Sequence, residues 1–185
     1  MVSFLFALMV LFVICAVWYF AVYNSFVALR VRIENAWSQI DIQLKRRHDL
    51  IPNLVEAVKG YMAYEKDTLE RVIKARNQAI DASSLKDKAT AENLLTQTLK
   101  SLFAVVEKYP ELKANQNVLN LQEELTSTEN KIAFARQYYN DEVMTLNTRI
   151  QTVPYNMVAR SGGFSNKEFF QIEDKADKEV PQVKL

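Results

Sequence analysis

Cysteine and histidine are almost missing from this 185-residue sequence, which contains one of each, Cys15 and His48. A single cysteine excludes an intrachain disulfide and a zinc site made of thiolates. A lone histidine outside any Glu-x-x-His pair argues against the di-metal centres that helical bundles hold. The sequence also offers no ordinary nucleophile–base triad, no phosphate-binding loop and no GxGxxG motif. We therefore predict no enzymatic activity, no metal, no cofactor and no small-molecule substrate.

Glycine and proline are scarce too, with three glycines and four prolines. So few turn-forming residues favour a few long helices over many short strands. An excess of one charge is also absent, because 23 Lys and Arg against 22 Asp and Glu give a net charge of +1. This balance predicts no nucleic-acid binding.

Charged side chains are absent from the first stretch, VSFLFALMVLFVICAVWYFAVY, which runs from Val2 to Tyr23. As a helix this stretch is about 33 Å long, which matches the hydrocarbon thickness of a membrane. Trp18, Tyr19 and Tyr23 at its C-terminal end are side chains of the kind that settle at the membrane interface. A cleaved signal peptide would need a basic start and a small-residue cleavage site, and neither is present. We therefore predict an uncleaved transmembrane helix over residues 1–23.

Basic residues follow this stretch and none precedes it. By the positive-inside rule, this asymmetry predicts an outside N-terminus, with the bulk of the chain in the cytoplasm. The basic residues concerned are Arg30, Arg32, Lys45, Arg46 and Arg47. Arg30 and Arg32 lie within about 15 Å of the expected interface if the helix continues. We therefore group them with Trp18, Tyr19 and Tyr23 as predicted membrane-interface residues.

An apolar seam with alternating spacings of three and four runs through residues 24–80. Such spacing places apolar side chains on one face of a helix that packs at a shallow angle against others. Pro52 does not interrupt the spacing of the apolar residues or shift their register. Its ring nevertheless removes a helical hydrogen bond to the carbonyl of His48. We predict one long helix kinked at Pro52, and two helices meeting there are the alternative. The seam consists of Ile33, Trp37, Ile40, Leu44, Ile51, Leu54, Val58, Tyr61, Val72, Ala75 and Ala79.

A second helix is predicted near residues 90–108. The polar connection before it contains Ser83, Ser84 and Thr90, each of which is a plausible helix cap. Pro110 should end this helix, because proline disfavours the helical conformation in the residue before it.

A third helix begins at a cap, Asn115 or Asn117, and runs to about Gln151, where Pro154 closes it. The RSGGF segment that follows favours a break, since two adjacent glycines disfavour helix. Ser165, with a glutamate three residues later, has the capping-box pattern and predicts a short fourth helix.

Each predicted helix has a single apolar face, so the helices must pack together to be stable in water. We therefore predict an all-α protein in which the transmembrane helix continues into an antiparallel up-and-down four-helix bundle over residues 24–172. Residues 173–185 are predicted to form a flexible tail. The large aromatic residues expected in the core are Trp37, Tyr138, Tyr139, Phe169 and Phe170.

Candidate polar contacts gather in the run Lys45-Arg46-Arg47-His48. Lys45, Arg46 and His48 are either a solvated face with ion pairs to neighbouring helices or a docking patch for an acidic partner or another copy. Arg47 and Glu65 occupy seam positions, where a charge is costly unless it is paired. We predict that each has a partner on a later helix and that these pairs set the register of the bundle. The candidate partners are Glu107, Glu129 and Arg136.

Several motifs together resemble the LemA family over almost the whole chain. The most specific motif is QLKRRHDLIPNLVEAVKGY, from Gln43 to Tyr61. Other matching segments are Tyr23-Asn24, Asn35–Asp41, Glu107–Asn115, Tyr139-Asn140, Phe169-Phe170 and Pro181-Gln182-Val183. The resemblance implies a short outside N-terminus, one membrane span, a four-helical up-and-down bundle and no catalytic residues. One departure is Tyr64 before Glu65, where relatives often have His-Glu, and it weakens the case for a metal ligand there.

Two functions agree with these observations. The first is a membrane-anchored scaffold that self-associates through its bundle and organises the lipid bilayer. The alternative is a regulatory adaptor that docks on another membrane protein, such as a protease or a transporter, through Lys45, Arg46 and His48.

Overall fold

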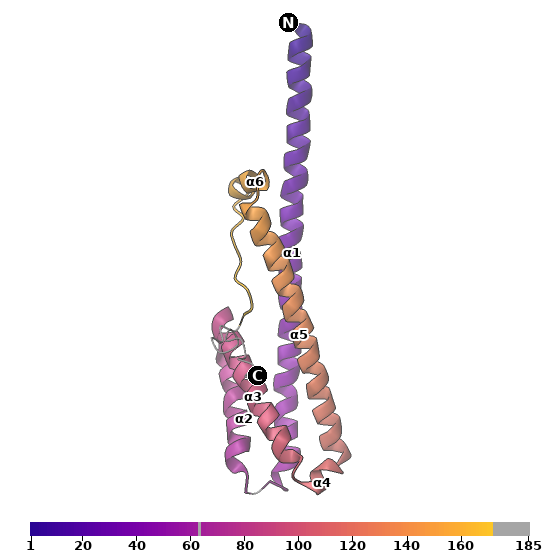
Figure 1. Ribbon diagram of the computed structural model, residues 1–185, viewed down its shortest axis with the longest axis vertical. Helices are drawn as coiled ribbons and strands as arrows, with labels where there is room; N and C mark the ends of the chain where they lie inside the picture. The colour runs from indigo at the N-terminus through magenta and orange to yellow at the C-terminus, as the bar shows by residue number, and fades with distance from the viewer. Residues whose placement is uncertain (63, 172–185) are drawn as a thin grey trace, which may run out of the picture. The chain divides into compact units, whose positions relative to one another are not determined.

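The computed structural model describes residues 1–62 and 64–171, and all regular elements in these ranges are helices (Figure 1). The helices are α1 (Val2–Lys59), α2 (Lys66–Asp81), α3 (Leu85–Val106), α4 (Pro110–Lys113), α5 (Gln116–Gln151) and α6 (Tyr155–Ser161). The predicted all-α class with a long apolar helix at the N-terminus is confirmed. The predicted tail over residues 173–185 lies outside the described residues.

Helix α1 passes through Pro52 and continues to Lys59, so the chain is not divided at the proline. Because proline has no N–H group, the carbonyl of His48 loses its usual helical partner. The Nε of Arg76 on α2 donates a hydrogen bond to that carbonyl at 2.7 Å. A neighbouring helix therefore supplies the bond that the proline removes.

The prediction of one helix through residue 80 is wrong at Gly60, where a turn separates α1 from α2. The amides of Tyr61 and Met62 both donate to the carbonyl of Val58, at 3.0 and 3.1 Å, as the helix ends. Met62 is buried and takes the position expected for Tyr61, which is 44% exposed. The apolar spacing continues on both sides of the turn, which is why periodicity alone did not reveal the break.

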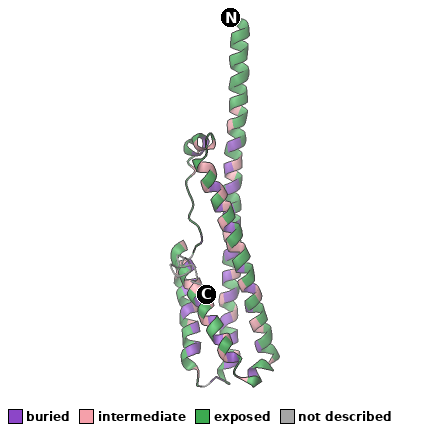
Figure 2. Ribbon diagram, in the orientation of Figure 1, coloured by how far each residue is buried: buried purple, intermediate pink, exposed green. Residues whose placement is uncertain are grey.

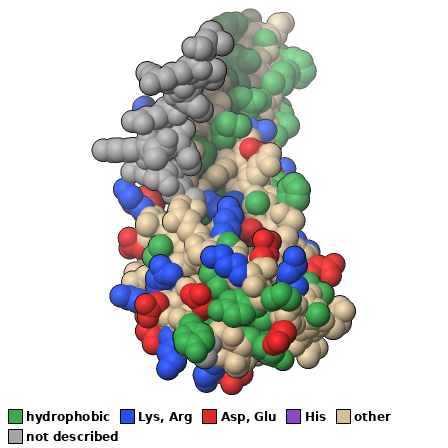
Figure 3. Space-filling model, turned by 60° about the horizontal axis from the view of Figure 1, so that its bottom comes forward, with side chains coloured by type: hydrophobic (Ala, Val, Ile, Leu, Met, Phe, Trp, Pro, Cys, Tyr) green, Lys and Arg blue, Asp and Glu red, His purple; other side chains and the backbone are tan. Residues whose placement is uncertain are grey.

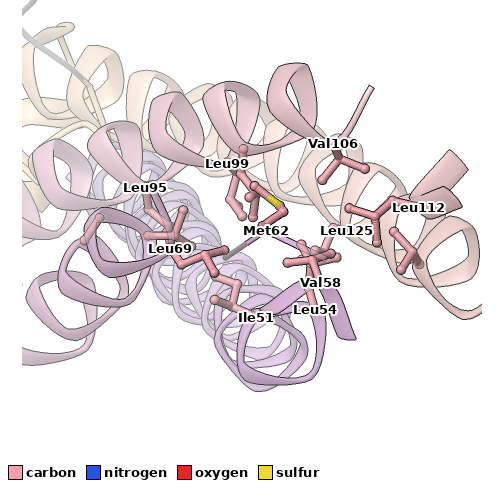
Figure 4. Close-up of a cluster of buried hydrophobic side chains, with 14 of the residues drawn as sticks. Ile51, Leu54, Val58, Met62, Leu69, Leu95, Leu99, Val106, Leu112 and Leu125 are labelled. Atoms are coloured by element: carbon pink, nitrogen blue, oxygen red, sulfur yellow. The ribbon is translucent and has the colours of Figure 1, made fainter. Parts of the chain in front are cut away.

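The chain forms two compact units, and the described part of unit 2 comprises residues 42–62, 64–132 and 170–171. Its core lies between the last part of α1, helices α2, α3 and α4, and the first part of α5. Figure 4 shows the labelled side chains of this core pointing toward one another. The core contains Ile51, Leu54, Val58, Met62, Leu69, Val72, Ala75, Ala79, Leu95, Leu99, Leu102, Val106, Leu112, Val118 and Leu125. One apolar face from each helix therefore closes this part of the bundle.

Two predicted caps define helix starts in unit 2. The Ser84 hydroxyl accepts from the amide of Asp87 at 3.0 Å, so α3 begins at Leu85, ahead of the start predicted near residue 90. The Asn115 side chain accepts from the amide of Asn117 at 3.0 Å and from that of Val118 at 3.4 Å at the start of α5. These bonds satisfy amides that the first turn of a helix leaves without partners.

Unit 1 comprises residues 1–41 and 133–169, and it joins the first part of α1 to the last part of α5, α6 and the segment after α6. Its buried side chains come from all three helices. They are Val22, Phe26, Leu29, Ile33, Ala36 and Ile40 on α1, Tyr139, Val143 and Leu146 on α5, and Val158 and Ala159 on α6. The part of α1 before Val22 is almost wholly exposed, as the green ribbon in Figure 2 shows.

The predicted fourth helix at Ser165 is wrong, because the short helix of this region is α6, which precedes the two glycines. Segment 164–171 has no helical residues. The Asn147 side chain on α5 donates to the carbonyl of Lys167 and accepts from its amide, both at 2.9 Å. The Tyr139 hydroxyl donates to the carbonyl of Glu168 at 3.1 Å. Side chains of α5 thus bind backbone groups of this segment that the predicted helix would have used for its own hydrogen bonds.

The aromatic residues expected in the core divide into two groups. Tyr139 and Phe170 are buried, and Trp37 is half-buried with its ring 5.8 Å from that of Tyr139. Tyr138 and Phe169 are 48% and 38% exposed, so their placement in the core is wrong. On α5, the adjacent residues Tyr138 and Tyr139 point about 100° apart, so one packing face accommodates only one of them.

Candidate functional site

A buried polar cluster in unit 2 is centred on Arg47, whose side chain is 1% exposed. Around it lie Glu92 and Thr96 on α3, Glu129 on α5 and the next residue of α1, His48. Glu92 is as deeply buried as the arginine, whereas Glu129 is 37% exposed. We call these five residues the Arg47 cluster.

Hydrogen bonds in the Arg47 cluster join three helices. The two terminal nitrogens of Arg47 donate separately, Nη2 to the Glu92 carboxylate and Nη1 to the Glu129 carboxylate. Nη1 also donates to the Thr96 hydroxyl at 3.0 Å, and Nη2 to the backbone carbonyl of Glu92 at 3.2 Å. The Nε2 of His48 lies 2.7 Å from the second carboxylate oxygen of Glu92. Arg47 therefore ties α1 to α3 and α5 through charge-assisted bonds.

The electrostatics of the cluster favour an ionised Glu92. Burial by itself raises the pKa of the Glu92 carboxyl. The hydrogen bond from His48 and the charge and hydrogen bond of Arg47 outweigh burial, so the pKa is lowered from its ordinary value of 4.5. The carboxylate thus stays charged against the arginine at neutral pH, as a buried ion pair requires.

The Arg47 cluster has little capacity for chemistry on a ligand. Its guanidinium occupies the space between the two carboxylates, where a cation would otherwise bind. Within residues 1–62 and 64–171, no group of three or more His, Cys, Asp or Glu side chains is placed to hold a metal ion. The cluster's charge-assisted bonds connect α1, α3 and α5, and removing one partner of such a buried pair is strongly destabilising.

Of the polar residues predicted to pair within the bundle, Arg47 and Glu129 meet in this cluster. Glu65 lies half-buried before α2, and its carbonyl accepts the amides of the first turn of that helix. Glu107 is exposed just beyond the end of α3, and Arg136 is half-buried on α5. Arg47 and Glu129 thus form an ion pair that joins two of these candidates.

Glu92 is the residue that sequence reasoning missed. It lies three residues before Leu95, and the spacing of threes and fours continues through Leu99, Leu102 and Val106. All five are buried. A carboxylate at a seam position of α3, facing an arginine at a seam position of α1, was the signal available in the sequence.

The predicted docking patch is partly used within unit 2. Arg46 forms an ion pair with Glu124 on α5, in which both side chains are about half exposed. His48 is half-buried against Glu92, while Lys45 is exposed. On the face drawn in Figure 3, basic and acidic side chains alternate and do not form a basic patch.

The predicted interface residues lie in unit 1, at the end of the exposed apolar part of α1. Trp18 and Tyr23 contact aromatic rings of Tyr155 and Phe164, with ring centroids 6.4 and 5.6 Å apart. Two further predicted residues, Arg30 and Arg32, are exposed on α1, and Arg32 lies 3.6 Å from the Glu142 carboxylate. The first part of α1 is long and apolar enough to cross a membrane.

Comparison with known proteins agrees with the resemblance seen in the motifs. Magnetosome protein MamQ 2 of Paramagnetospirillum magneticum is 26% identical, over 96% of this chain and 77% of its own length. Magnetosome protein MamQ of Magnetospirillum gryphiswaldense is 23% identical, over 87% of this chain and 70% of its own. Protein LemA of Metamycoplasma hominis is 27% identical, over 77% of this chain and 65% of its own.

The family comparison covers most of the chain and includes both the basic run and the Arg47 cluster. The model of the LemA family matches residues 36–185. Together with the long apolar helix and relatives of these names, it indicates a membrane-associated helical protein. This protein belongs to the LemA family.

Proposed function

We propose that this protein is a membrane-anchored scaffold that self-associates and has no enzymatic activity. The observation that carries the proposal is the continuity of α1 from Val2 to Lys59. The same helix supplies the exposed apolar stretch and a core face of the bundle. Helices that associate in or near the membrane would therefore hold their bundles together without a flexible linker.

The proposed topology has one membrane span, an outside N-terminus and the bulk of the chain in the cytoplasm. It is supported by the basic residues after the apolar stretch, of which Arg30 and Arg32 are exposed on α1. Basic residues that follow a span favour its cytoplasmic side.

Unit 1 contains two exposed faces that suit contact with a second copy. On α5, Phe134 and Tyr138 are 72% and 48% exposed and lie one turn apart. On α1, an exposed stripe with no charged residue lies opposite the buried seam, and it consists of Asn24, Ala28, Val31, Asn35 and Ser38. Large aromatic side chains are enriched in protein interfaces, and charged side chains are depleted from interface centres. These faces support self-association of the chain.

The names of the relatives also support a structural role. Two are named for a cellular structure, the magnetosome, and none of the three is named for a reaction. A scaffold does not require the catalytic groups that the Arg47 cluster lacks.

The test is the mass of the full-length protein in mild detergent, measured by light scattering with the detergent contribution subtracted. We expect particles of several chains for the wild type and smaller particles for the double variant Phe134→Glu, Tyr138→Glu. Met144→Glu is the matched control, because Met144 is also exposed on α5 but faces another direction. Wild-type particles of one chain at every protein concentration, both in detergent and in lipid nanodiscs, would contradict the proposal.

The adaptor function remains the second proposal, with Lys45, Arg46 and His48 as its patch. The contacts of Arg46 with Glu124 and of His48 with Glu92 do not favour it, since both groups are engaged within unit 2. A single-chain particle that enlarges only in the presence of another membrane protein would favour the adaptor over the scaffold.

A further inference from the structure

Helix α6 lies beside α1 at the point where the exposed apolar stretch ends. The rings of Trp18 and Tyr155 are 6.4 Å apart, and the hydroxyls of Tyr19 and Ser161 are 2.9 Å apart. In Figure 1, α6 lies at the end of α5 that is nearest to the N-terminus of α1. If α1 crosses a membrane, α6 is therefore at the depth of its aromatic interface.

Helix α6 and the turn before it expose two large apolar side chains, and Arg160 is exposed beside them. Val158 and Ala159 are buried, whereas Val153 and Met157 are 73% and 69% exposed. Val153 lies in the turn before α6 and Met157 lies within the helix, so the two exposed side chains are four positions apart in the chain. Apolar groups exposed beside the end of a membrane span have lipid as their natural partner, since the apolar surface of α1 continues directly from them.

Charge at this end of unit 1 points to the same partner. No acidic residue occurs in residues 1–33 or in residues 143–167, the two segments that meet here. The basic residues in these segments include Arg30 and Arg160, both exposed, and Arg149, which donates to the Ser25 hydroxyl at 2.6 Å. The exposed Arg30 and Arg160, next to apolar side chains, match an anionic phospholipid surface.

We propose that α6 and the turn before it form a second membrane-contacting element. Val153 and Met157 enter the boundary between headgroups and acyl chains, and Arg160 binds anionic phospholipid headgroups of the same leaflet. The inference rests on the proposed membrane anchorage through α1. Two contacts from distant parts of the chain would then hold unit 1 against the membrane and limit its rotation about α1.

The experiment places a nitroxide label at single cysteines of the full-length protein in vesicles of phosphatidylcholine and phosphatidylglycerol. The background is Cys15→Ser, and the labelled positions are Leu11→Cys, Met157→Cys and Gln137→Cys. Gln137 is exposed on α5, about 21 Å along the helix from its end at Gln151. Depth is measured from the collision rates of each label with oxygen, which enriches in lipid, and with a water-soluble nickel chelate.

We expect the label at residue 11 deep in the bilayer, the label at 157 at the headgroup boundary and the label at 137 in water. A label at 157 as accessible to nickel as that at 137, with the label at 11 protected, overturns the inference and leaves the anchorage intact. A label at 11 in water overturns the anchorage itself. Val153→Cys repeats the measurement at an independent position in the turn before α6.

The role of Arg160 is tested in the same system with Arg160→Gln. Removing one basic residue from an anionic surface lowers the membrane partition of that site by about fivefold. We expect this loss at the label at 157 in vesicles with phosphatidylglycerol and no change in vesicles of phosphatidylcholine alone. Equal protection with and without Arg160 in the anionic vesicles would overturn the headgroup contact.

Discussion

Arg47→Met is the substitution that most directly tests the account of the buried cluster. Methionine keeps most of the length of the arginine side chain but removes its charge and its donors. Glu92, whose side chain is 2% exposed, then keeps only His48 as a partner in the cluster. The second carboxylate, Glu129, is 37% exposed and can turn to water. Most of the lost stability therefore comes from Glu92, whose carboxylate stays charged in the interior without Arg47.

The expected magnitude follows from the burial of the pair. Removing one partner of a buried ion pair destabilises a protein by about 3–5 kcal/mol. For a chain of this size, each kcal/mol lowers the melting temperature by about 2–4 °C, so we expect a decrease of at least about 6 °C. Arg46→Met is the matched control, because the Arg46 and Glu124 side chains are 47% and 49% exposed. An exposed pair contributes about 0–1 kcal/mol, so the control should melt within about 4 °C of the wild type.

The assay is thermal unfolding of the full-length protein in one detergent, followed by circular dichroism of the helical signal. The double variant Arg47→Met, Glu92→Leu also removes the unpaired Glu92 carboxylate. We therefore expect its melting temperature to be higher than that of Arg47→Met alone. Equal melting temperatures for Arg47→Met and Arg46→Met would refute the reasoning, since burial would then make no difference. A double variant that melts below Arg47→Met would refute the assignment of the cost to Glu92.

Three further predictions concern single groups. Because the pKa of Glu92 is lowered from 4.5, the stability it contributes is present above pH 4.5 and is lost as the pH falls through the lowered value. In the Glu92→Gln variant, the melting temperature should therefore fall less steeply as the pH is lowered into the acid range. An unchanged fall would contradict the contribution of the Glu92 carboxylate to stability. Arg76→Met leaves the His48 carbonyl beside the proline without its donor, so we expect a loss of about 1–3 kcal/mol in thermal unfolding, and no loss would show that water replaces the bond. Asn147→Leu removes both the donor to the Lys167 carbonyl and the acceptor of the Lys167 amide, and faster hydrogen exchange of that amide should follow, whereas unchanged exchange would mean that this pair does not hold the segment.

The helical elements could be predicted largely from local signals. Seams of threes and fours identified the packing faces of α1, α3 and α5, and the caps at Ser84 and Asn115 mark true helix starts. These signals are local, because a helix bonds to itself and shows its buried face in its own sequence. The first apolar stretch was recognised for the same reason.

The continuation or loss of a helix was harder to predict where its backbone groups form hydrogen bonds with other parts of the chain. A helix continuing through Pro52 was predicted, with two helices as the alternative, but the sequence did not show that Arg76 of α2 supplies the missing hydrogen bond. Ser165 had a capping pattern, but Asn147 bonds to the backbone of Lys167 and the segment is not helical. A sequence pattern cannot include a donor that only the packed structure brings within reach.

The sequence by itself determined the all-α class, the membrane-compatible helix and the need of Arg47 for a buried partner. Composition and periodicity specify these, since each depends on residue type and spacing along one helix. Only the tertiary structure decided that Glu92 shares Arg47 with Glu129, and that α6 lies against Trp18 and Tyr19. Both arrangements join residues distant in sequence, and their geometry depends on how the helices pack.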